Sequence, residues 1–473
     1  MMPGVKLPGA GVLVPAIAGG LVVIALLVVL MRRRPDAFAL LAILALPFRL
    51  PIAAQGRTVN LLIPLYLVVA AGTLAHLLPR VLARVRPRAE PGGGVPAGSD
   101  PPGAQAPPGS APVSLRAPSS WLTPRGLELV LLTVIALYVV QALYSADRAK
   151  AATNIAFFYV PFALLFVLLR QTRWTRELLL RCLAIAVALA VVFAGIGFIE
   201  YARKALFLNP KVVAANEFDN YFRVNSLFFD PNIYGRFLAL VMIAVTTTVL
   251  WSSRRRDVLI ATAVLAWLMA GLVTSFSQSS IAALLLGLAV LAAWRWDVRL
   301  TAYLSAGLVV LGLALLLLAP ASLHFGLAGS GGSTSNATSG RTKLITGGLE
   351  LFAKRPLQGY GSGSFEKEYR LHEVGGAAPN ATSASHTIPV TVAAEQGIVG
   401  VALYLTLLLS AFCVLFRGAG SSPPRIAVAA CFAALVLHTW TYADFLEDPM
   451  TWTLLGIGVA LASAGRTGRA SSF

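Results

Sequence analysis

The sequence has little charge: Asp, Glu, Lys and Arg make up 12% of its 473 residues, against about 25% in a typical soluble protein. Hydrophobic residues make up 57% of the chain. Apolar runs recur from end to end, and most approach the roughly 20 residues that a helix needs to cross a bilayer. The runs are residues 11–31, 37–48, 59–78, 126–144, 151–169, 178–199, 230–251, 258–274, 280–294, 300–319, 387–416, 426–442 and 450–464.

These runs exclude a soluble globular fold. Backbone amides inside hydrocarbon must be hydrogen-bonded within the protein, so each run is expected to be a helix. The sequence therefore predicts an all-α, polytopic integral membrane bundle of about 12–13 transmembrane helices, counted with the short run at residues 37–48.

Cysteine is also scarce. The three cysteines, Cys182, Cys413 and Cys431, all lie inside apolar runs, which predicts neither a disulfide framework nor a cysteine metal cluster. The long connections carry no evident cluster of metal-ligating carboxylates.

Positive charge exceeds negative charge, with 38 Lys and Arg against 20 Asp and Glu, a net charge of +18. The excess gathers in alternate connections, for example at residues 32–34, 254–256 and 417–425. Positively charged loops stay on the cytoplasmic side of a membrane. The charge thus predicts topology, with the C-terminus inside, and no nucleic-acid partner is expected.

The chain divides into four parts. Residues 1–87 hold the N-terminal transmembrane helices, and residues 88–120, rich in Pro and Gly, are expected to be a disordered cytoplasmic linker. Residues 121–465 form the transmembrane core, including long outer-face connections at 200–229 and 320–385, and residues 466–473 form a cytoplasmic tail. No internal repeat typical of secondary transporters is evident.

The first long connection ends in Arg223 and an Asp230-Pro231-Asn232 element. Asp230 suits a helix N-cap and Pro231 the first helical position. The planar guanidinium of Arg223 can bind phosphate oxygens through two parallel hydrogen bonds. The alternative is that Arg223 only anchors the chain at the membrane interface.

The second long connection opens with a polar strip at residues 329–340, expected to be flexible. An amphipathic helix follows, with Arg341, Glu350, Lys354 and Arg355 placed to meet water or lipid headgroups. The glycines of residues 359–363, which include Tyr360, either expose backbone amides to an anion or simply form a turn.

His386 lies where this connection re-enters the membrane, at a predicted helix N-terminus. The positive end of the helix dipole and nearby arginines favour a neutral imidazole that can accept a proton. A structural histidine is the alternative. Glu395 lies on the same predicted helix, where an ionisable group is expected to pair with an arginine or to shape the site.

Taken in order, these pieces resemble the O-antigen ligase and O-antigen polymerase superfamily of bacterial envelope glycan transferases. The resemblance covers residues 151–416 and departs from the family pattern at Gln278, where Arg is usual, and at Thr387, where Asn is usual. The matching pieces are Arg223 to Asn232, residues 275–279 at the start of a span, Arg341 followed by residues 356–361, and His386 followed by Glu395-Gln396-Gly397.

The resemblance implies an inverting glycosyltransferase that works without a metal or other cofactor, and whose donor is a glycan on undecaprenyl diphosphate. Arg223 and Arg341 would hold the diphosphate, and His386 would take the proton from the acceptor hydroxyl. Further candidates for substrate binding are Lys343, Arg355, Tyr360, Asp230, Asn232 and Glu395.

The expected setting is the outer face of a bacterial cytoplasmic membrane, with membrane lipid as a further partner. The acceptor stays open: a lipid-anchored core, a growing lipid-linked glycan or a protein hydroxyl. A flippase or other transporter of lipid-linked oligosaccharides is the alternative class. We favour transfer chemistry because the spans are largely free of charge, whereas a transporter needs polar groups along a path through the membrane.

Overall fold

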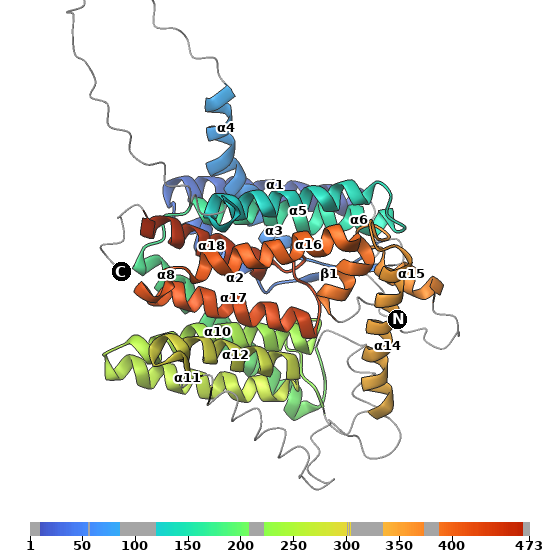
Figure 1. The fold of residues 1–473 in the computed structure, drawn as a ribbon. Helices are drawn as coiled ribbons and strands as arrows, with labels where there is room; N and C mark the ends of the chain where they lie inside the picture. The colour runs from blue at the N-terminus through green and yellow to red at the C-terminus, as the bar shows by residue number, and fades with distance from the viewer. Residues whose placement is uncertain are drawn as a thin grey trace, which may run out of the picture.

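The computed structural model describes residues 10–54, 57–85, 120–207, 222–299, 301, 303, 334–372 and 387–466. In this part of the chain the protein is a helical bundle (Figure 1). Nine helical stretches of the described residues are long and apolar enough to cross a membrane, which confirms the predicted all-α membrane class. They are Ile63–Leu82, Pro124–Ala142, Arg148–Gln171, Arg176–Arg203, Pro231–Trp251, Arg255–Thr274, Gln278–Arg295, Ile388–Phe416 and Pro423–Thr441, and Pro449–Gly465 is a shorter apolar helix.

The N-terminal part adds a small hairpin that the sequence did not predict. Helices α1 (Ala10–Arg33) and α2 (Ala37–Ala45) precede the antiparallel strands β1 (Leu50–Ala54) and β2 (Arg57–Leu61). The next span consists of α3 (Ile63–Gly72), the π-helical turn η1 (Thr73–Leu77) and α4 (Leu78–Val85). In Figure 1, α4 projects beyond the bundle.

Several later helices begin at side chains that cap them. Thr123, Asp147 and Thr175 each accept a hydrogen bond from a backbone amide in the first turn that follows, which satisfies a donor that the helix itself leaves unpaired. The helices are α5 (Pro124–Ala142), α6 (Arg148–Asn154), which continues through the π-helical turn η3 (Ile155–Tyr159) into α7 (Val160–Gln171), and α8 (Arg176–Arg203).

Helix α10 (Pro231–Trp251) is the most enclosed of these spans, with 67% of its apolar window buried. It packs against α8, α11 (Arg255–Thr274), α12 (Gln278–Arg295) and α17 (Pro423–Thr441). Close helix crossings need small residues: a Cβ added to Gly287 of α12 would lie 2.2 Å from the Ile243 side chain. The last span, α18 (Pro449–Arg466), packs on α7 and α17.

The predicted amphipathic helix is α14 (Thr334–Lys354), followed by the short α15 (Phe365–His372) and by the span α16 (Ile388–Phe416). Figure 1 shows α14 at one end of the bundle, running crosswise to the spans. The helix begins at Thr334, so residues 334–340, expected to be flexible, form its first turns.

Some predictions fall outside the described residues. These include nearly all of the expected linker at residues 88–120, nearly all of the expected span at residues 300–319, the tail beyond residue 466, and His386. The division of the chain into four parts therefore stays a prediction.

Candidate active site

One end of the bundle gathers most of the predicted site residues, and Arg223 lies there in the segment before α10. Its Nε–H donates a hydrogen bond to the carbonyl of Ser275 at 3.3 Å, and the backbone N–H of Val224 donates to the carbonyl of Thr274 at 3.2 Å. These bonds hold the segment against the turn between α11 and α12. The Arg223 side chain is half-buried.

A buried carboxylate that the sequence analysis missed shapes the same segment. Glu200, near the end of α8, accepts hydrogen bonds from the backbone amides of Phe207, Asn225 and Ser226, the last at 2.7 Å. Ser226 has a φ of 51°, a left-handed conformation that side chains rarely adopt. Glu200 therefore fixes the chain two and three residues after Arg223.

The start of α10 is confirmed as predicted, with Asp230 as N-cap and Pro231 in the first turn. Asp230 Oδ1 accepts a hydrogen bond from the Asn232 amide at 2.6 Å. Asn232 is buried, and its Oδ1 accepts from the Ser277 hydroxyl at 2.9 Å, while its carbonyl accepts from Ser280 at 3.2 Å. Asp230 thus caps α10, and Asn232 holds the start of that helix against α12. Their expected contact with substrate stays a prediction.

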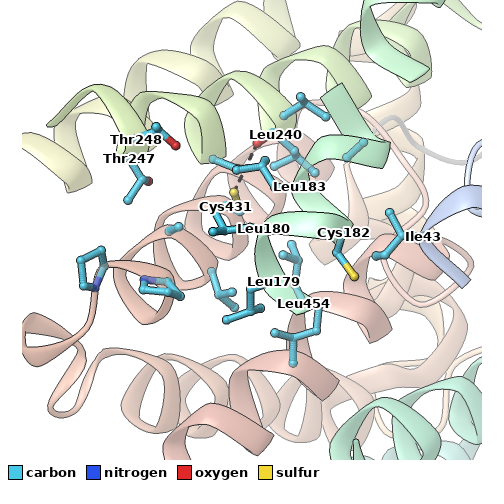
Figure 2. Close-up of a pocket in the computed structure, with 18 of the residues that line it drawn as sticks. Ile43, Leu179, Leu180, Cys182, Leu183, Leu240, Thr247, Thr248, Cys431 and Leu454 are labelled. Carbon is cyan, nitrogen blue, oxygen red and sulfur yellow. Dashed lines mark hydrogen bonds between the residues drawn. The ribbon is translucent and has the colours of Figure 1, made fainter. Parts of the chain in front are cut away.

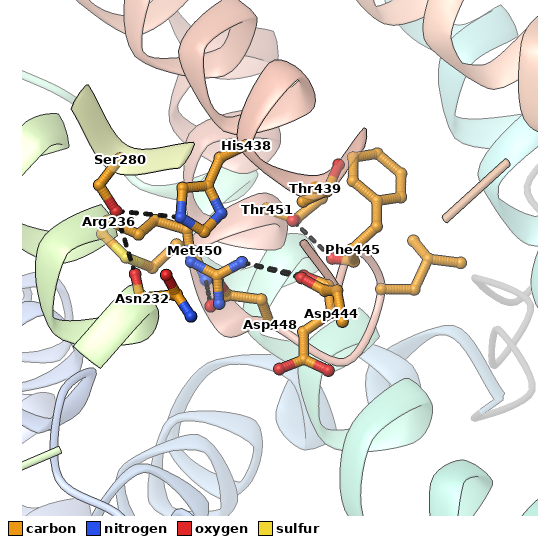
Figure 3. A network of polar contacts seen from close by, with 12 residues as sticks. Asn232, Arg236, Ser280, His438, Thr439, Asp444, Phe445, Asp448, Met450 and Thr451 are labelled. Carbon is orange, nitrogen blue, oxygen red and sulfur yellow. Dashed lines mark hydrogen bonds and ion pairs between the residues drawn. The ribbon is translucent and has the colours of Figure 1, made fainter. Parts of the chain in front are cut away.

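One turn further along α10, Arg236 lies at the centre of a buried network (Figure 3). The guanidinium Nη2 forms an ion pair with Asp448 Oδ2 at 2.8 Å, and these side chains are 1% and 2% exposed. The Nη1 group donates to the carbonyls of Ala443 and Asp444 at 3.2 and 3.3 Å. Arg236 therefore ties the turn between α17 and α18 to α10.

Arg236 was not among the predicted site residues, although a charged residue inside an apolar run is the signal that could have found it. Arg236 is an exception to the expectation that the spans are largely free of charge. The arginine is nevertheless paired and lies close to one end of its span. It marks no path through the membrane.

His438 of α17 extends this network toward α12 (Figure 3). Its Nε2 lies 3.3 Å from the hydroxyl of Ser279 and 3.1 Å from that of Ser280, and the side chain is fully buried. The starts of α10 and α12 and the end of α17 are thereby joined by polar contacts.

An acidic side chain lies in the turn between α17 and α18. Glu447 Oε1 accepts a hydrogen bond from Asn154 Nδ2 at 2.8 Å. Burial, and then the neighbouring carboxylate of Asp444, raise the pKa of Glu447 above its ordinary value.

The glycine turn after α14 has its amides occupied by the protein itself. Gly359, Gly361 and Gly363 all have positive φ. The carboxylate of Glu395 accepts hydrogen bonds from the amides of Gly363 at 2.8 Å and Phe365 at 3.0 Å. In this structure the turn binds an internal anion, and Glu395 holds it in place. A contact between Glu395 and substrate stays a prediction.

The same turn fills a break in α16. Gly397, with φ 64° and ψ −163°, interrupts the helix. The carbonyls of Ala394 and Glu395 accept hydrogen bonds from the amides of Tyr360 at 3.2 Å and Gly361 at 2.7 Å. The amide of Ile398, which would bond to Ala394 in a regular helix, donates instead to the carbonyl of Pro356 at 2.7 Å.

Two other predicted residues, Arg355 and Tyr360, lie at this turn. The Tyr360 ring is buried, and the guanidinium of Arg355 stacks over it at 4.5 Å from the ring centroid, a cation–π contact. Lys343 is exposed on α14. Arg341 belongs to α14, and nothing of its side chain is described. His386 directly precedes the described Thr387, which is the N-cap of α16.

Helix α14 packs directly on the beginning of α16. A Cβ added to Gly348 would lie 2.5 Å from the Val390 side chain, so this crossing requires a glycine. Arg341 lies seven residues, or about two turns, before Gly348 along α14. Among the described residues, no group of three or more His, Cys, Asp or Glu side chains could hold a metal ion.

Fold and site together define a polytopic helical membrane protein with a network of buried polar groups at one end of its bundle. Within that class, residues 263–405 match the family model described as O-antigen ligase. The match extends from α11 into α16 and agrees with the predicted resemblance to the O-antigen ligase family. No curated protein matches the chain.

Proposed function

We propose that the protein is a membrane glycan ligase. It transfers a glycan from an undecaprenyl-diphosphate-linked donor to a hydroxyl group of a glycan or lipid-anchored acceptor. The transfer takes place on the outer face of the bacterial cytoplasmic membrane. The observation that carries the proposal is the match to the O-antigen ligase family model, which covers Arg341, His386, Glu395 and the glycine turn.

In this mechanism Arg223 and Arg341 bind the donor diphosphate. Guanidinium groups make paired, charge-assisted hydrogen bonds to phosphate oxygens. As the bond between the anomeric carbon and the diphosphate breaks, negative charge grows on the leaving group, and fixed cations stabilise it. The half-buried position of Arg223 and its bond to Ser275 support such a fixed placement.

His386 removes the proton from the acceptor hydroxyl while that oxygen attacks the anomeric carbon. Attack from the side opposite to the diphosphate inverts the configuration at that carbon. The electron pair of the breaking bond leaves with the diphosphate, and the proton stays on the imidazole. Two guanidinium groups would supply the positive charge that a divalent ion supplies elsewhere, so the reaction is metal-independent.

The hydrogen bonds between Glu395 and the glycine turn support this mechanism by fixing distances. They join the loop after α14 to the first turns of α16, and Gly348 of α14 packs against Val390 of α16. The helix that carries Arg341 and the residue that follows His386 are therefore held together. Catalysis by positioning needs that kind of rigidity, because small displacements of a reacting group cost large factors in rate.

An in vitro transfer assay with purified full-length protein tests these roles. Arg223→Lys keeps the positive charge but loses the planar guanidinium, which can form two parallel hydrogen bonds to a phosphate. Turnover should therefore fall roughly a hundredfold or more. Arg203→Lys, at the exposed end of α8, is the matched control and should keep wild-type turnover. His386→Ala should bind donor and transfer almost nothing. Wild-type turnover by folded Arg223→Lys or His386→Ala would reject the corresponding role.

Cysteine labelling tests the membrane face. In a variant without the three native cysteines, Leu371→Cys should react with an impermeant thiol reagent in intact cells, and Val298→Cys should not. Both side chains are exposed, 67% and 66%, so access depends on the side of the membrane. Labelling of Val298→Cys alone would reverse the orientation and move the proposed site to the cytoplasm.

A further inference from the structure

A second site lies in the opposite half of the bundle from Arg223. A cavity of about 960 Å³ opens between the first half of α8, the second half of α10 and the first half of α17, with α2 and α18 completing its wall (Figure 2). The proposed transfer reaction makes no use of it.

The body of this cavity is apolar. Leu179, Leu183, Leu240 and Leu454 line it (Figure 2). Two of its polar groups bond to the backbone of the protein: Thr247 Oγ donates to the carbonyl of Ile243 at 3.3 Å, and Cys431 Sγ to the carbonyl of Leu240 at 3.4 Å. Such a lining fits hydrocarbon and gives a polar ligand few partners.

The mouth of the cavity is positively charged. Arg176 and Arg254 line it, and both side chains are exposed. Helix α8 begins at Arg176 and α11 at Arg255, so the positive ends of two helix dipoles point the same way. Asp257 is the acidic side chain in the lining, and its Oδ2 lies 3.5 Å from the Ser252 hydroxyl.

The depth of the cavity matches one leaflet of a bilayer. Along α8 the lining runs from Arg176 to Ala186, and along α17 from Pro423 to Cys431. At a rise of 1.5 Å per residue these stretches measure about 15 and 12 Å. A hydrocarbon core is about 30 Å thick, so one leaflet is about 15 Å.

We propose that this cavity binds an anionic phospholipid from the leaflet at the arginine-rich end of the bundle. The acyl chains occupy the apolar body, and the phosphate contacts Arg176 and Arg254. Two guanidinium groups at the level of the lipid headgroups can bind a phosphate, and an apolar cavity one leaflet deep can hold acyl chains. Together these features fit an anionic phospholipid. The inference is independent of the proposed transferase activity.

The test compares phosphatidylglycerol with phosphatidylcholine of identical acyl chains, added to purified full-length protein in neutral detergent. Native mass spectrometry measures the bound fraction. Phosphatidylglycerol should bind roughly tenfold more tightly, because the choline cation of phosphatidylcholine offsets the attraction between its phosphate and the two arginines. The double variant Arg176→Gln/Arg254→Gln should lose this preference. Arg173→Gln/Arg255→Gln removes two exposed neighbours outside the lining and should keep it.

A second variant tests the apolar body. Ala244 lines the cavity in the middle of α10, so Ala244→Phe should fill it and abolish binding of both lipids. Leu259→Phe, on an exposed position of α11 outside the lining, should not. Equal affinity for the two lipids, equal loss in both arginine pairs, or full binding by Ala244→Phe would overturn the proposal. Displacement of phosphatidylglycerol by a polyprenyl diphosphate would overturn it too, by assigning the cavity to the donor.

Discussion

The Arg236–Asp448 ion pair offers the sharpest test of how this bundle is held together. Arg236→Met leaves the Asp448 carboxylate almost fully buried, with its cationic partner gone. Removing one partner of such a pair costs about 3–5 kcal/mol. The carbonyls of Ala443 and Asp444 also lose their donor, at about 1 kcal/mol each. The free energy of unfolding should therefore fall by roughly 5–7 kcal/mol.

A double variant separates the free energy of the ion pair from the contributions of its two side chains. Arg236→Met/Asp448→Leu removes both charges and should recover most of that loss, because apolar residues often replace a buried pair at little cost. Reversible unfolding in mixed micelles gives the free energies for a double-mutant cycle. The exposed Arg181–Glu177 pair is the matched control, and Arg181→Met should cost less than about 1 kcal/mol. A cost below about 1 kcal/mol for Arg236→Met, or additive effects in the cycle, would refute this reasoning.

Two further predictions concern the loop and the acidic turn. Gly359→Ala should lower the melting temperature markedly, because φ is +64° and the new Cβ would lie 2.3 Å from the Glu395 carbonyl; Gly19→Ala, with nothing within 4 Å, should not. Equal melting temperatures would contradict this account. Burial and Asp444 raise the pKa of Glu447, so the folded state holds this proton more tightly, and stability is lost as pH rises from the ordinary value to the raised one. Glu447→Gln should melt above wild type beyond that window and like wild type below it; a lower melting temperature above the window would contradict the assignment.

The transmembrane spans could be predicted within a few residues because hydrocarbon thickness imposes their length. The run at residues 126–144 became Pro124–Ala142, and the run at residues 178–199 became Arg176–Arg203. The hairpin was missed because an apolar run does not distinguish a strand from a helix. Residues 59–61, taken as the start of a span, form the end of β2.

Local contacts of the site could be predicted, and distant ones could not. The Asp230 cap joins neighbouring residues, so the sequence alone reveals it. Asn232 meets Ser277 over 45 residues, and Arg236 meets Ala443 over 207. Only the packing of helices brings such partners together. An anion site was one of two interpretations of the glycine turn, and the partner of its amides, Glu395, which lies 32 residues beyond Gly363, could not be inferred.

At Gly397 the chain of α16 continues, but its regular helical hydrogen bonding is interrupted. The carbonyls just before the break are bonded to the loop after α14, and the amide just after it is bonded there as well. The turns of α16 before Gly397 are consequently cross-braced to that loop, and so is the first residue of the span that follows. Because the loop holds both sides of the break, it stiffens the kink, and a force on the loop would reach the two parts of α16 together.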